Sequence, residues 1–280
     1  MPPGESTHTR SAATVVVSTD RPEWRMRAVD QHLVSFLDPT SYEADQYRAL
    51  RLVIEQIHSH RKTIAVTSAV AGDGKTTTAL NLAGALAHAP DTRILVADFD
   101  LRTPSVGARL GLTAQSPGLV DLILDQDLVP DDVVQWHPQF RLAVLPAGRP
   151  LAVTYELLKS PRLAAILQDA RRQYDYVVLD TPPLVPVPDS RLIADHVDGF
   201  VMVVAAHRTP RLLFQDALKL VDPAKLIGLV FNGDDRPRSR YYYGYYYGYG
   251  RRQARESRMA DKIRRFLSRR RGPRSGRSHD

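Results

Sequence analysis

Short apolar runs alternate with stretches of helical periodicity from residue 63 onward. Continuous apolar runs such as 177–179 and 201–204 are typical of strands that are covered on both faces. We expect strands at 63–67, 93–97, 141–145, 176–179, 200–205 and 226–231, and helices near 76–88, 118–125, 160–172, 188–196 and 210–221. This order predicts an α/β fold, a doubly wound and mostly parallel sheet with helices on both faces.

The parts of the chain outside this alternation differ in character. Residues 1–40 are polar and are predicted to be disordered. Residues 41–57 carry apolar side chains at helical spacing, and Ser41 is suited to cap that helix. We expect one domain at 41–233, followed by a linker with a tyrosine cluster at 234–250 and a basic tail at 251–280.

Positive charge is concentrated in the tail. Residues 251–280 contain twelve Lys and Arg but three Asp and Glu, a local charge of +9, so the remainder carries −2 of the net +7. This distribution favours contact of the tail with an anionic membrane or an acidic partner, and argues against nucleic acid as a partner. The absence of cysteine excludes disulfides and thiolate chemistry. No apolar run approaches the roughly 20 residues of a membrane span, so we expect a cytoplasmic location.

A glycine-containing loop lies between the first predicted strand and a helix of small and apolar residues. Such glycines let backbone N–H groups surround a phosphate, and the lysine reaches the β- and γ-oxygens. The Thr76 hydroxyl suits Mg²⁺, and Thr77 lies near the α-phosphate. Ala69 replaces the first glycine of G-x-x-x-x-G-K-[ST], but the order of strand, loop and helix is intact. The sequence thus predicts a site for ATP and Mg²⁺ at Ala71, Gly72, Asp73, Gly74, Lys75, Thr76 and Thr77.

Two later apolar strands end in aspartate. Asp98 and Asp100 follow one of them, and Asp180 follows the other. Residues i and i+2 of an extended segment project to the same side, so we expect both carboxylates of the first pair to face the crevice at the carboxyl edge of the sheet. A single aspartate in such a place equally suits a helix cap. Three of them beside a triphosphate suit the binding of Mg²⁺ and the acceptance of a hydroxyl proton.

Seven tyrosines occur within residues 241–249, and no other aromatic residue type occurs there. A run of this kind can be an adhesive low-complexity segment or a base-stacking surface. Because a phosphate loop precedes it, we interpret it as a set of phosphate acceptors. They are Tyr241, Tyr242, Tyr243, Tyr245, Tyr246, Tyr247 and Tyr249.

These ordered motifs resemble those of the bacterial tyrosine kinases. The phosphate loop corresponds to their Walker A motif, residues 96–104 to Walker A′ and residues 178–183 to Walker B. Members of this family are cytoplasmic autokinases of capsule and exopolysaccharide export, with a P-loop fold related to ParA and MinD ATPases. The likeness spans roughly residues 41–249. It implies phosphoryl transfer from Mg·ATP to tyrosine, in trans between the subunits of a ring.

The resemblance also implies roles for single residues. Lys75 would stabilise charge on the transferring phosphate, and Asp98 would polarise the tyrosine hydroxyl. Asp100 and Asp180 would belong to the metal shell together with Thr76. A further two implications concern Asn232, placed where related ATPases contact adenine, and the set Asp45, Arg48 and Arg51. That set matches a Glu-x-x-Arg-x-x-Arg oligomerisation signature with Asp in place of Glu, although a solvated helix face has the same pattern.

The implied partners are a transmembrane activator of the chain-length regulator type, a protein-tyrosine phosphatase and further copies of the chain. The implied location is the inner face of the cell membrane. Two alternatives stay open at this point. One is a ParA/MinD-like positioning ATPase without kinase activity. Those proteins usually carry a signature lysine at the position of Val70, so this residue argues against that alternative. The other is a non-enzymatic aromatic and basic scaffold.

Overall fold

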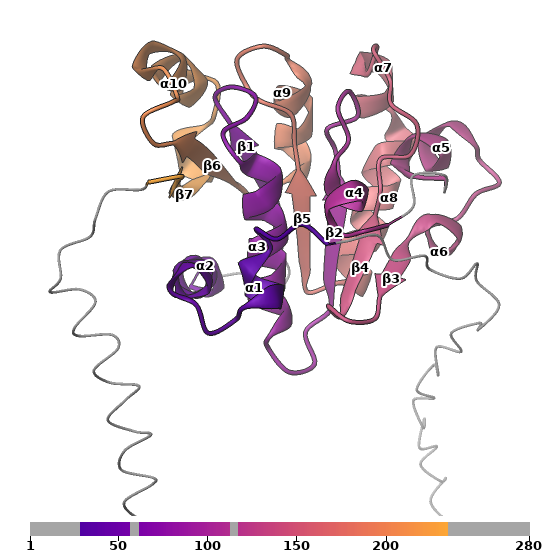
Figure 1. The fold of residues 1–280 in the computed structure, drawn as a ribbon. Coiled ribbons are helices and arrows are strands. Elements are labelled where there is room, and N and C mark those ends of the chain that lie inside the picture. The colour runs from indigo at the N-terminus through magenta and orange to yellow at the C-terminus, as the bar shows by residue number, and fades with distance from the viewer. Residues whose placement is uncertain (1–28, 57–61, 113–116, 235–280) are drawn as a thin grey trace, which may run out of the picture. The chain divides into compact units, whose positions relative to one another are not determined.

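The computed structural model describes residues 29–56, 62–112 and 117–234. These residues form a seven-stranded sheet (Figure 1). Its strands are β1 (Lys62–Ser68), β2 (Ile94–Asp98), β3 (Gln135–His137), β4 (Leu142–Leu145), β5 (Tyr176–Asp180), β6 (Gly199–Ala205) and β7 (Leu226–Asn232). Across the sheet they follow the order β3-β4-β2-β5-β1-β6-β7, and every neighbouring pair is parallel except β3 and β4. The predicted doubly wound and mostly parallel sheet is confirmed.

Each of the six predicted strands is present with ends that agree within one residue. Strand β3 was not predicted. It has three residues, of which only His137 is buried, and it pairs antiparallel with β4 at the edge of the sheet. So short a strand shows neither alternation nor a continuous apolar run, and only pairing with β4 defines it.

Helices connect the strands and cover the sheet. They are α1 (Val34–Leu37), α2 (Tyr42–Glu55), α3 (Lys75–Ala87), α4 (Val106–Arg109), α5 (Leu119–Leu124), α6 (Pro130–Val133), α7 (Tyr155–Leu158), α8 (Pro161–Gln173), α9 (Asp189–Ile193) and α10 (Arg211–Lys219), with 3₁₀ turns at Ala194–His196 and Pro223–Lys225. The predicted helix at 188–196 is divided between α9 and the first of these turns. Helices α1, α4, α6 and α7 have four residues each, too few for a periodic pattern.

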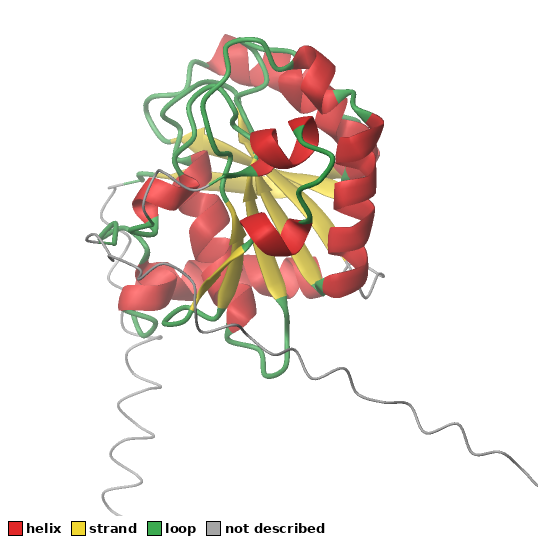
Figure 2. Cartoon of the chain, turned by 90° about the vertical axis from the view of Figure 1, so that its right-hand side faces the viewer, coloured by secondary structure: helices red, strands yellow, loops and turns green. Residues whose placement is uncertain are grey.

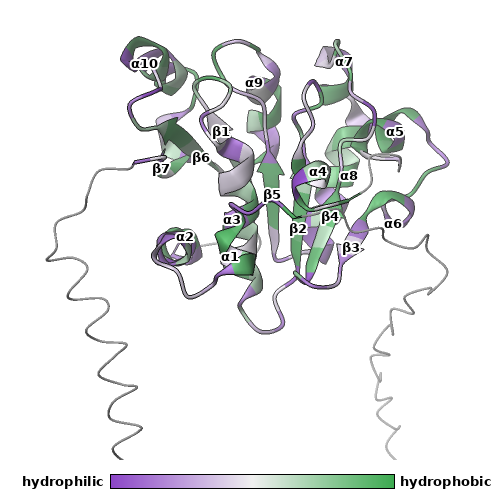
Figure 3. Cartoon of the chain, viewed as in Figure 1, coloured by the Kyte–Doolittle hydropathy of each residue, from purple (hydrophilic) through white to green (hydrophobic). Residues whose placement is uncertain are grey.

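The strands alternate their side chains between two apolar layers. On one face, Ile64 and Val66 of β1 join the buried residues of α3, with Leu33 and Ile54 packed beyond them. On the other face, Ala65 joins a layer built mainly by α5, α8, α9 and α10. Figure 2 shows helices on both sides of the strands, and Figure 3 shows how apolar residues dominate the strands between them. This double cover explains why β1, β2, β4 and β6 are buried throughout.

The predicted disordered segment at 1–40 is too long at its C-terminal end. Leu33 has no exposed surface, and Phe36 lies so close to Gly84 of α3 that a Cβ there would meet its ring at 2.8 Å. Residues 29–40 are too few to show a periodic pattern, so only their packing against the domain reveals these two apolar anchors. The predicted cap of α2 is present, because Ser41 Oγ accepts a hydrogen bond from the backbone N–H of Ala44 at 3.2 Å.

Several predictions fall on residues outside the described part of the chain. They concern residues 1–28, residue 57, the tyrosines of 241–249 and the basic tail. Within the described part, no helix has the length and apolar character needed to cross a membrane.

Candidate functional site

The strand register brings the predicted site residues together at one edge of the sheet. Asp98 at the end of β2 is the direct neighbour of Asp180 at the end of β5. Val66 of β1 pairs with Asp180 on the other side, and the phosphate loop follows β1. The carboxyl end of β5, where its arrow ends in Figure 1, therefore lies between the loop and the Asp98 segment. This is the place where open α/β sheets bind ligands.

The phosphate loop has the backbone conformation that its glycines permit. Gly72 and Gly74 have φ of +85° and +95°, in the left-handed region that favours glycine. At Gly74 the Asn232 side chain also fills the space of a Cβ, with Nδ2 only 1.9 Å from that position. Asn232 Nδ2 donates a hydrogen bond to the backbone carbonyl of Asp73 at 2.9 Å. The residue predicted as an adenine contact thus also braces the loop.

A second brace comes from Asp73, whose side chain is buried. Its Oδ1 accepts a hydrogen bond from Thr209 Oγ at 2.8 Å, and Thr209 Oγ in turn accepts one from the backbone N–H of Ala205 at 2.8 Å. The loop between β6 and α10 therefore holds the phosphate loop through a carboxylate. No local pattern identifies Thr209, because it lies 136 residues from its partner in the chain.

Lys75 and Thr76 meet the carboxylates directly. Lys75 Nζ lies 2.7 Å from Asp100 Oδ2 and 4.0 Å from Asp180 Oδ1. Thr76 Oγ donates to Asp180 Oδ2 at 2.6 Å and also lies 3.0 Å from Ser105 Oγ. Three of the four predicted catalytic side chains, Lys75, Asp100 and Asp180, are therefore in one cluster with the predicted metal ligand Thr76.

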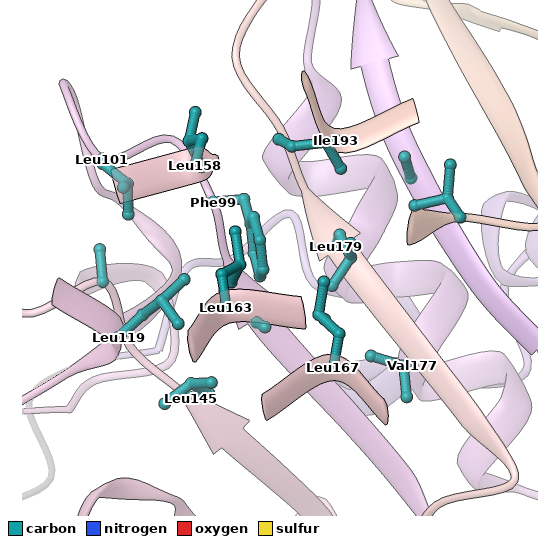
Figure 4. Packing of buried hydrophobic residues seen from close by; sticks show 14 of the residues in the cluster. Phe99, Leu101, Leu119, Leu145, Leu158, Leu163, Leu167, Val177, Leu179 and Ile193 are labelled. Atoms are coloured by element: carbon teal, nitrogen blue, oxygen red, sulfur yellow. The ribbon is translucent and has the colours of Figure 1, made fainter. Parts of the chain in front are cut away.

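Asp98 has a different environment. Its carboxylate accepts backbone N–H groups from Asp100, Ser105 and Val106 at 2.8–3.1 Å, so it holds the start of α4. Strand β2 ends at Asp98, and the chain beyond it is no longer a regular strand. Phe99 and Leu101 turn into the core, where Figure 4 shows them among leucines of α7 and α8. Asp100 consequently faces Lys75, while Asp98 lies deeper, with 1% of its surface exposed.

Burial sets the ionisation of the cluster. Burial, reinforced by the charge of Asp180, raises the pKa of Asp98 to about 7. Burial likewise raises the pKa of Asp180 to about 6, although Lys75 and the Thr76 hydroxyl oppose it. Burial acts to lower the pKa of Lys75, but the charges of Asp180 and Asp100 outweigh it and hold that pKa above its usual value. The site thus holds a charged Lys75 close to two carboxylates, those of Asp98 and Asp180, that ionise reluctantly.

These shifts predict a loss of stability as the pH rises. The folded-state pKa values of Asp98 and Asp180 lie above the ordinary value of 3.8, so their stabilising contribution is complete below about pH 4 and is lost as the pH rises through 6 to 7. We expect the free energy of unfolding without nucleotide to fall by a few kcal/mol in all, roughly, between pH 5 and pH 8. Urea unfolding at several pH values measures it.

The control for this prediction is Asp98→Asn, which removes one of the two titrating groups. Burial lowers the pKa of His137, so this residue makes the free energy of unfolding rise with pH, opposite to the two aspartates. The difference in pH dependence between wild type and Asp98→Asn is therefore more informative than the pH dependence of either protein alone. The variant should show a shallower loss of stability toward high pH. Identical slopes would contradict the assignment of the shift to Asp98.

A cavity of about 380 Å³ lies over the cluster. Its lining includes Ala71, Gly72, Gly74, Lys75, Thr76 and Asp100, together with Arg102 and Arg109. Within the described residues, Asp180 Oδ1 is buried without a hydrogen-bond partner, which fits a carboxylate oxygen awaiting a cation or its water. No group of three or more His, Asp or Glu side chains in that same part of the chain is arranged to hold a metal. Mg²⁺ is usually held by one or two carboxylates jointly with phosphates and waters, and Asp100 and Asp180 would be the carboxylates here.

Two arginines at this cavity were not singled out by the sequence. Arg102 Nε donates to Asp189 Oδ2 at 2.9 Å, and its Nη1 and Nη2 donate to the Ala152 carbonyl and to Thr154 Oγ. Asp189 also accepts from Thr154 Oγ at 2.7 Å, so these contacts join the segment after β2 to the starts of α7 and α9. Arg109 is the second, and its Nη1 pairs with Asp30 and donates to Thr77 Oγ. Arg102 stands two residues after Asp100, but only the fold identifies what it binds.

The predicted oligomerisation residues make contacts within the subunit. Arg48 pairs with Asp45 and donates to the Pro39 carbonyl. Arg51 pairs with Glu55 at 2.6 Å and donates to the Ala85 carbonyl at 3.0 Å. These contacts fix the side chains on α2, and the contact between subunits stays a prediction.

Comparison with known proteins shows what the chain as a whole is similar to. The profile of the AAA domain matches residues 61–196. The tyrosine-protein kinase YwqD of Bacillus subtilis is 31% identical over 222 residues, which cover 77% of this chain and 92% of YwqD. The succinoglycan biosynthesis transport protein ExoP of Rhizobium meliloti is 34% identical over 205 residues, which cover 70% of this chain but 26% of ExoP. The crystal structure of the chimerical protein CapA2B2 is similar with a TM-score of 0.67 and 27% identity, covering 74% of this chain and 93% of that one.

Proposed function

The chain belongs to the bacterial tyrosine kinases of capsule and exopolysaccharide biosynthesis, and we propose that it transfers the γ-phosphoryl group of ATP to tyrosines 241–249 of its own sequence. The observation that carries the proposal is the cluster of Lys75, Thr76, Asp100 and Asp180 beneath a cavity bounded by the phosphate loop. A hydrolytic ATPase needs the loop and a metal site too, so acceptance by tyrosine is the part that experiment has to decide.

Lys75 changes partner in this proposal. Its ammonium is held by Asp100 at 2.7 Å, so it exchanges this carboxylate for phosphate oxygens when nucleotide binds. Asp100 and Asp180 are then free to hold a metal ion or its waters together with Thr76. Mg²⁺ in that place would neutralise charge on the phosphates. Asp180 Oδ1 supports this role, because it accepts no hydrogen bond from the described residues and Lys75 Nζ approaches it only to 4.0 Å.

The tyrosine hydroxyl needs a carboxylate to receive its proton as the phosphorus–oxygen bond forms. Asp98 is proposed for this task, since a pKa of about 7 suits proton acceptance near neutral pH. Its Oδ1 accepts one backbone N–H and its Oδ2 accepts two, so Oδ1 keeps a lone pair for the hydroxyl proton. Asp100 lines the cavity and is the second candidate.

The wider setting is proposed from the family. The subunits would form a ring through Asp45, Arg48 and Arg51 of α2, and a neighbouring copy would supply the tyrosines in trans. A transmembrane activator would hold the kinase at the inner face of the membrane, where the basic tail meets anionic lipid, and a phosphatase would reverse the reaction. The name of ExoP couples that relative to polysaccharide transport, which supports polysaccharide synthesis or export as the controlled process.

Labelling with radioactive ATP and Mg²⁺ tests the proposal. The wild type is compared with a variant in which all seven tyrosines of 241–249 are phenylalanine. We expect label on the wild type and a loss of more than about 90% of it in the variant, since phenylalanine lacks the acceptor oxygen. Mass spectrometry of protein from its native cells, where any activator is present, locates the modified residues.

The variant keeps the described domain unchanged, so nucleotide binding serves as its control and should not differ from wild type. Release of free phosphate with unlabelled protein would identify a ParA/MinD-like ATPase instead. If the protein is not labelled, no free phosphate is released and no phosphotyrosine is found in 241–249 of the native material, the kinase proposal is wrong. The scaffold alternative then remains.

A further inference from the structure

We propose that Arg109 is a nucleotide-binding residue that contacts the α- and β-phosphates from the side of the cavity, and that Asp30 positions it. The inference rests on the proposed function, because it assumes a nucleotide in this cavity. It concerns a residue outside the phosphate loop and outside both aspartate motifs. Arg109 is the last residue of α4, the helix whose first backbone N–H groups are held by Asp98.

The position of the guanidinium is the first argument. Arg109 lines the same cavity as Gly74, Lys75 and Thr76. Its Nη1 lies 3.2 Å from Thr77 Oγ, at the first turn of α3, where the α-phosphate is expected. A guanidinium there adds a fixed positive charge to the potential of the helix N-terminus.

The charge balance of the site is the second argument. Lys75 is surrounded by Asp98, Asp100 and Asp180, so the centre of the cavity has more carboxylates than ammonium groups. Nucleotide phosphates add further negative charge, and additional cations at the rim lower the cost of bringing them in. Arginine suits such a place because its planar fork donates two parallel hydrogen bonds to a phosphate.

The two arginines of the cavity differ in their free donors. Arg102 uses Nε, Nη1 and Nη2 on protein acceptors. The hydrogen bonds that Arg109 makes with side chains of the described residues use only Nη1, toward Asp30 and Thr77. Its Nη2 and Nε are thus left to donate to a ligand. Arg109 is therefore the arginine that can bind a ligand without breaking its present hydrogen bonds. A side chain that is 35% exposed is open to that ligand.

Asp30 fixes the orientation of this arginine from a segment that precedes α1. Its carboxylate Oδ2 pairs with Arg109 Nη1, and its backbone N–H donates to the Arg109 carbonyl at 2.9 Å. The carboxylate is itself held, because the backbone N–H of His32 donates to Oδ1 at 2.9 Å. Asp30 thus acts through Arg109 as a positioning residue, and it touches no part of the predicted phosphate cradle itself.

Nucleotide affinity tests the proposal without any need for kinase activity. Titration of the full chain with ADP and with ATP, each with Mg²⁺, gives Kd for wild type, Arg109→Ala and Arg109→Lys. Loss of a charge-assisted hydrogen bond to phosphate should raise Kd for both nucleotides by roughly tenfold in Arg109→Ala. Arg109→Lys should have a Kd between those of wild type and Arg109→Ala, since lysine keeps the charge but lacks the planar pair of donors. Arg172→Ala, which removes an arginine that pairs with Asp169 on the distant helix α8, should leave Kd unchanged.

The role of Asp30 is tested by a double-mutant cycle. Asp30→Asn should raise Kd about threefold in the wild-type background and have no effect in Arg109→Ala, because it acts through the arginine. An equal effect in both backgrounds would overturn the positioning role.

The outcomes separate this proposal from the proposed function. Equal Kd values for wild type and Arg109→Ala would overturn the inference alone, and so would a loss confined to ATP, which would place the guanidinium at the γ-phosphate. A wild type that binds neither nucleotide would overturn the proposed function with it. Thermal unfolding of the nucleotide-free variants identifies any that fail to fold, and Arg109→Lys then carries the comparison.

Discussion

Lys75→Met is expected to lower the rate of autophosphorylation by about a thousandfold, which is the scale of removing a cation that stabilises the phosphoryl-transfer transition state. The same substitution should also lower the stability of the nucleotide-free protein. Asp100 and Asp180 are 2% and 0% exposed, and without Lys75 they become buried charges with no ammonium beside them. Breaking a buried pair by removing one partner costs about 3–5 kcal/mol. Initial rates of phosphotyrosine formation and urea unfolding measure the two effects.

Because the variant changes two properties at once, a second variant has to separate them. Lys75→Met combined with Asp100→Asn removes one of the uncompensated carboxylates, so stability should recover in part while activity stays lost. Lys219→Met removes an exposed lysine that pairs with Asp216 on α10, and should change neither. Full activity in a stable Lys75→Met protein would contradict the role of Lys75.

Asp180→Asn should move activity and stability in opposite directions. We expect the rate to fall by at least about a hundredfold, because an amide is a poor substitute for a carboxylate that holds a metal ion. At pH 8 the melting temperature without nucleotide should rise, because the substitution removes a fully buried charge whose Oδ1 accepts no hydrogen bond from the described residues. At pH 5, where a carboxyl with a pKa of about 6 is mostly protonated, the two proteins should melt at nearly the same temperature.

Asp169→Asn is the matched control, since this aspartate is half exposed on α8 and pairs with Arg172. It should leave both the rate and the melting temperature as they are. A rate for Asp180→Asn close to that of wild type would remove Asp180 from the metal site. A melting temperature that falls at pH 8 would show that its contacts with Thr76 and Lys75 stabilise the fold more than its burial costs.

The sheet could be predicted from the sequence because its strands are buried on both faces. Short apolar runs such as Val177 to Leu179, separated by helical stretches, are typical of buried parallel strands and of few other structures. The elements that were missed are short and depend on distant partners. Strand β3 exists through β4, and α1 exists because Leu33 and Phe36 pack against α3. No local pattern of four residues contains that information.

The site residues also fall into those that a local motif predicts and those that only distant contacts reveal. Lys75, Thr76 and the three aspartates could be predicted because each follows directly from a strand end or a loop motif in the chain. The alternation rule failed for Asp98 and Asp100, since β2 ends at Asp98 and the two carboxylates have different partners. Contacts such as Arg109 with Asp30 cross 79 residues, and only packing of the N-terminal segment onto the domain creates them.

Strand β7 has a consequence for the choice of acceptor. It ends at Asn232, which braces the phosphate loop, and the first tyrosine of the cluster comes nine residues later. Nine residues span at most about 30 Å and seventeen at most about 60 Å, so chain length alone limits how far the proposed acceptors, from Tyr241 to Tyr249, can reach from Asn232. Tethers of this length give effective concentrations on the order of millimolar. At such local concentrations we expect the proposed acceptors to be selected by proximity, without a groove that reads the sequence around each tyrosine.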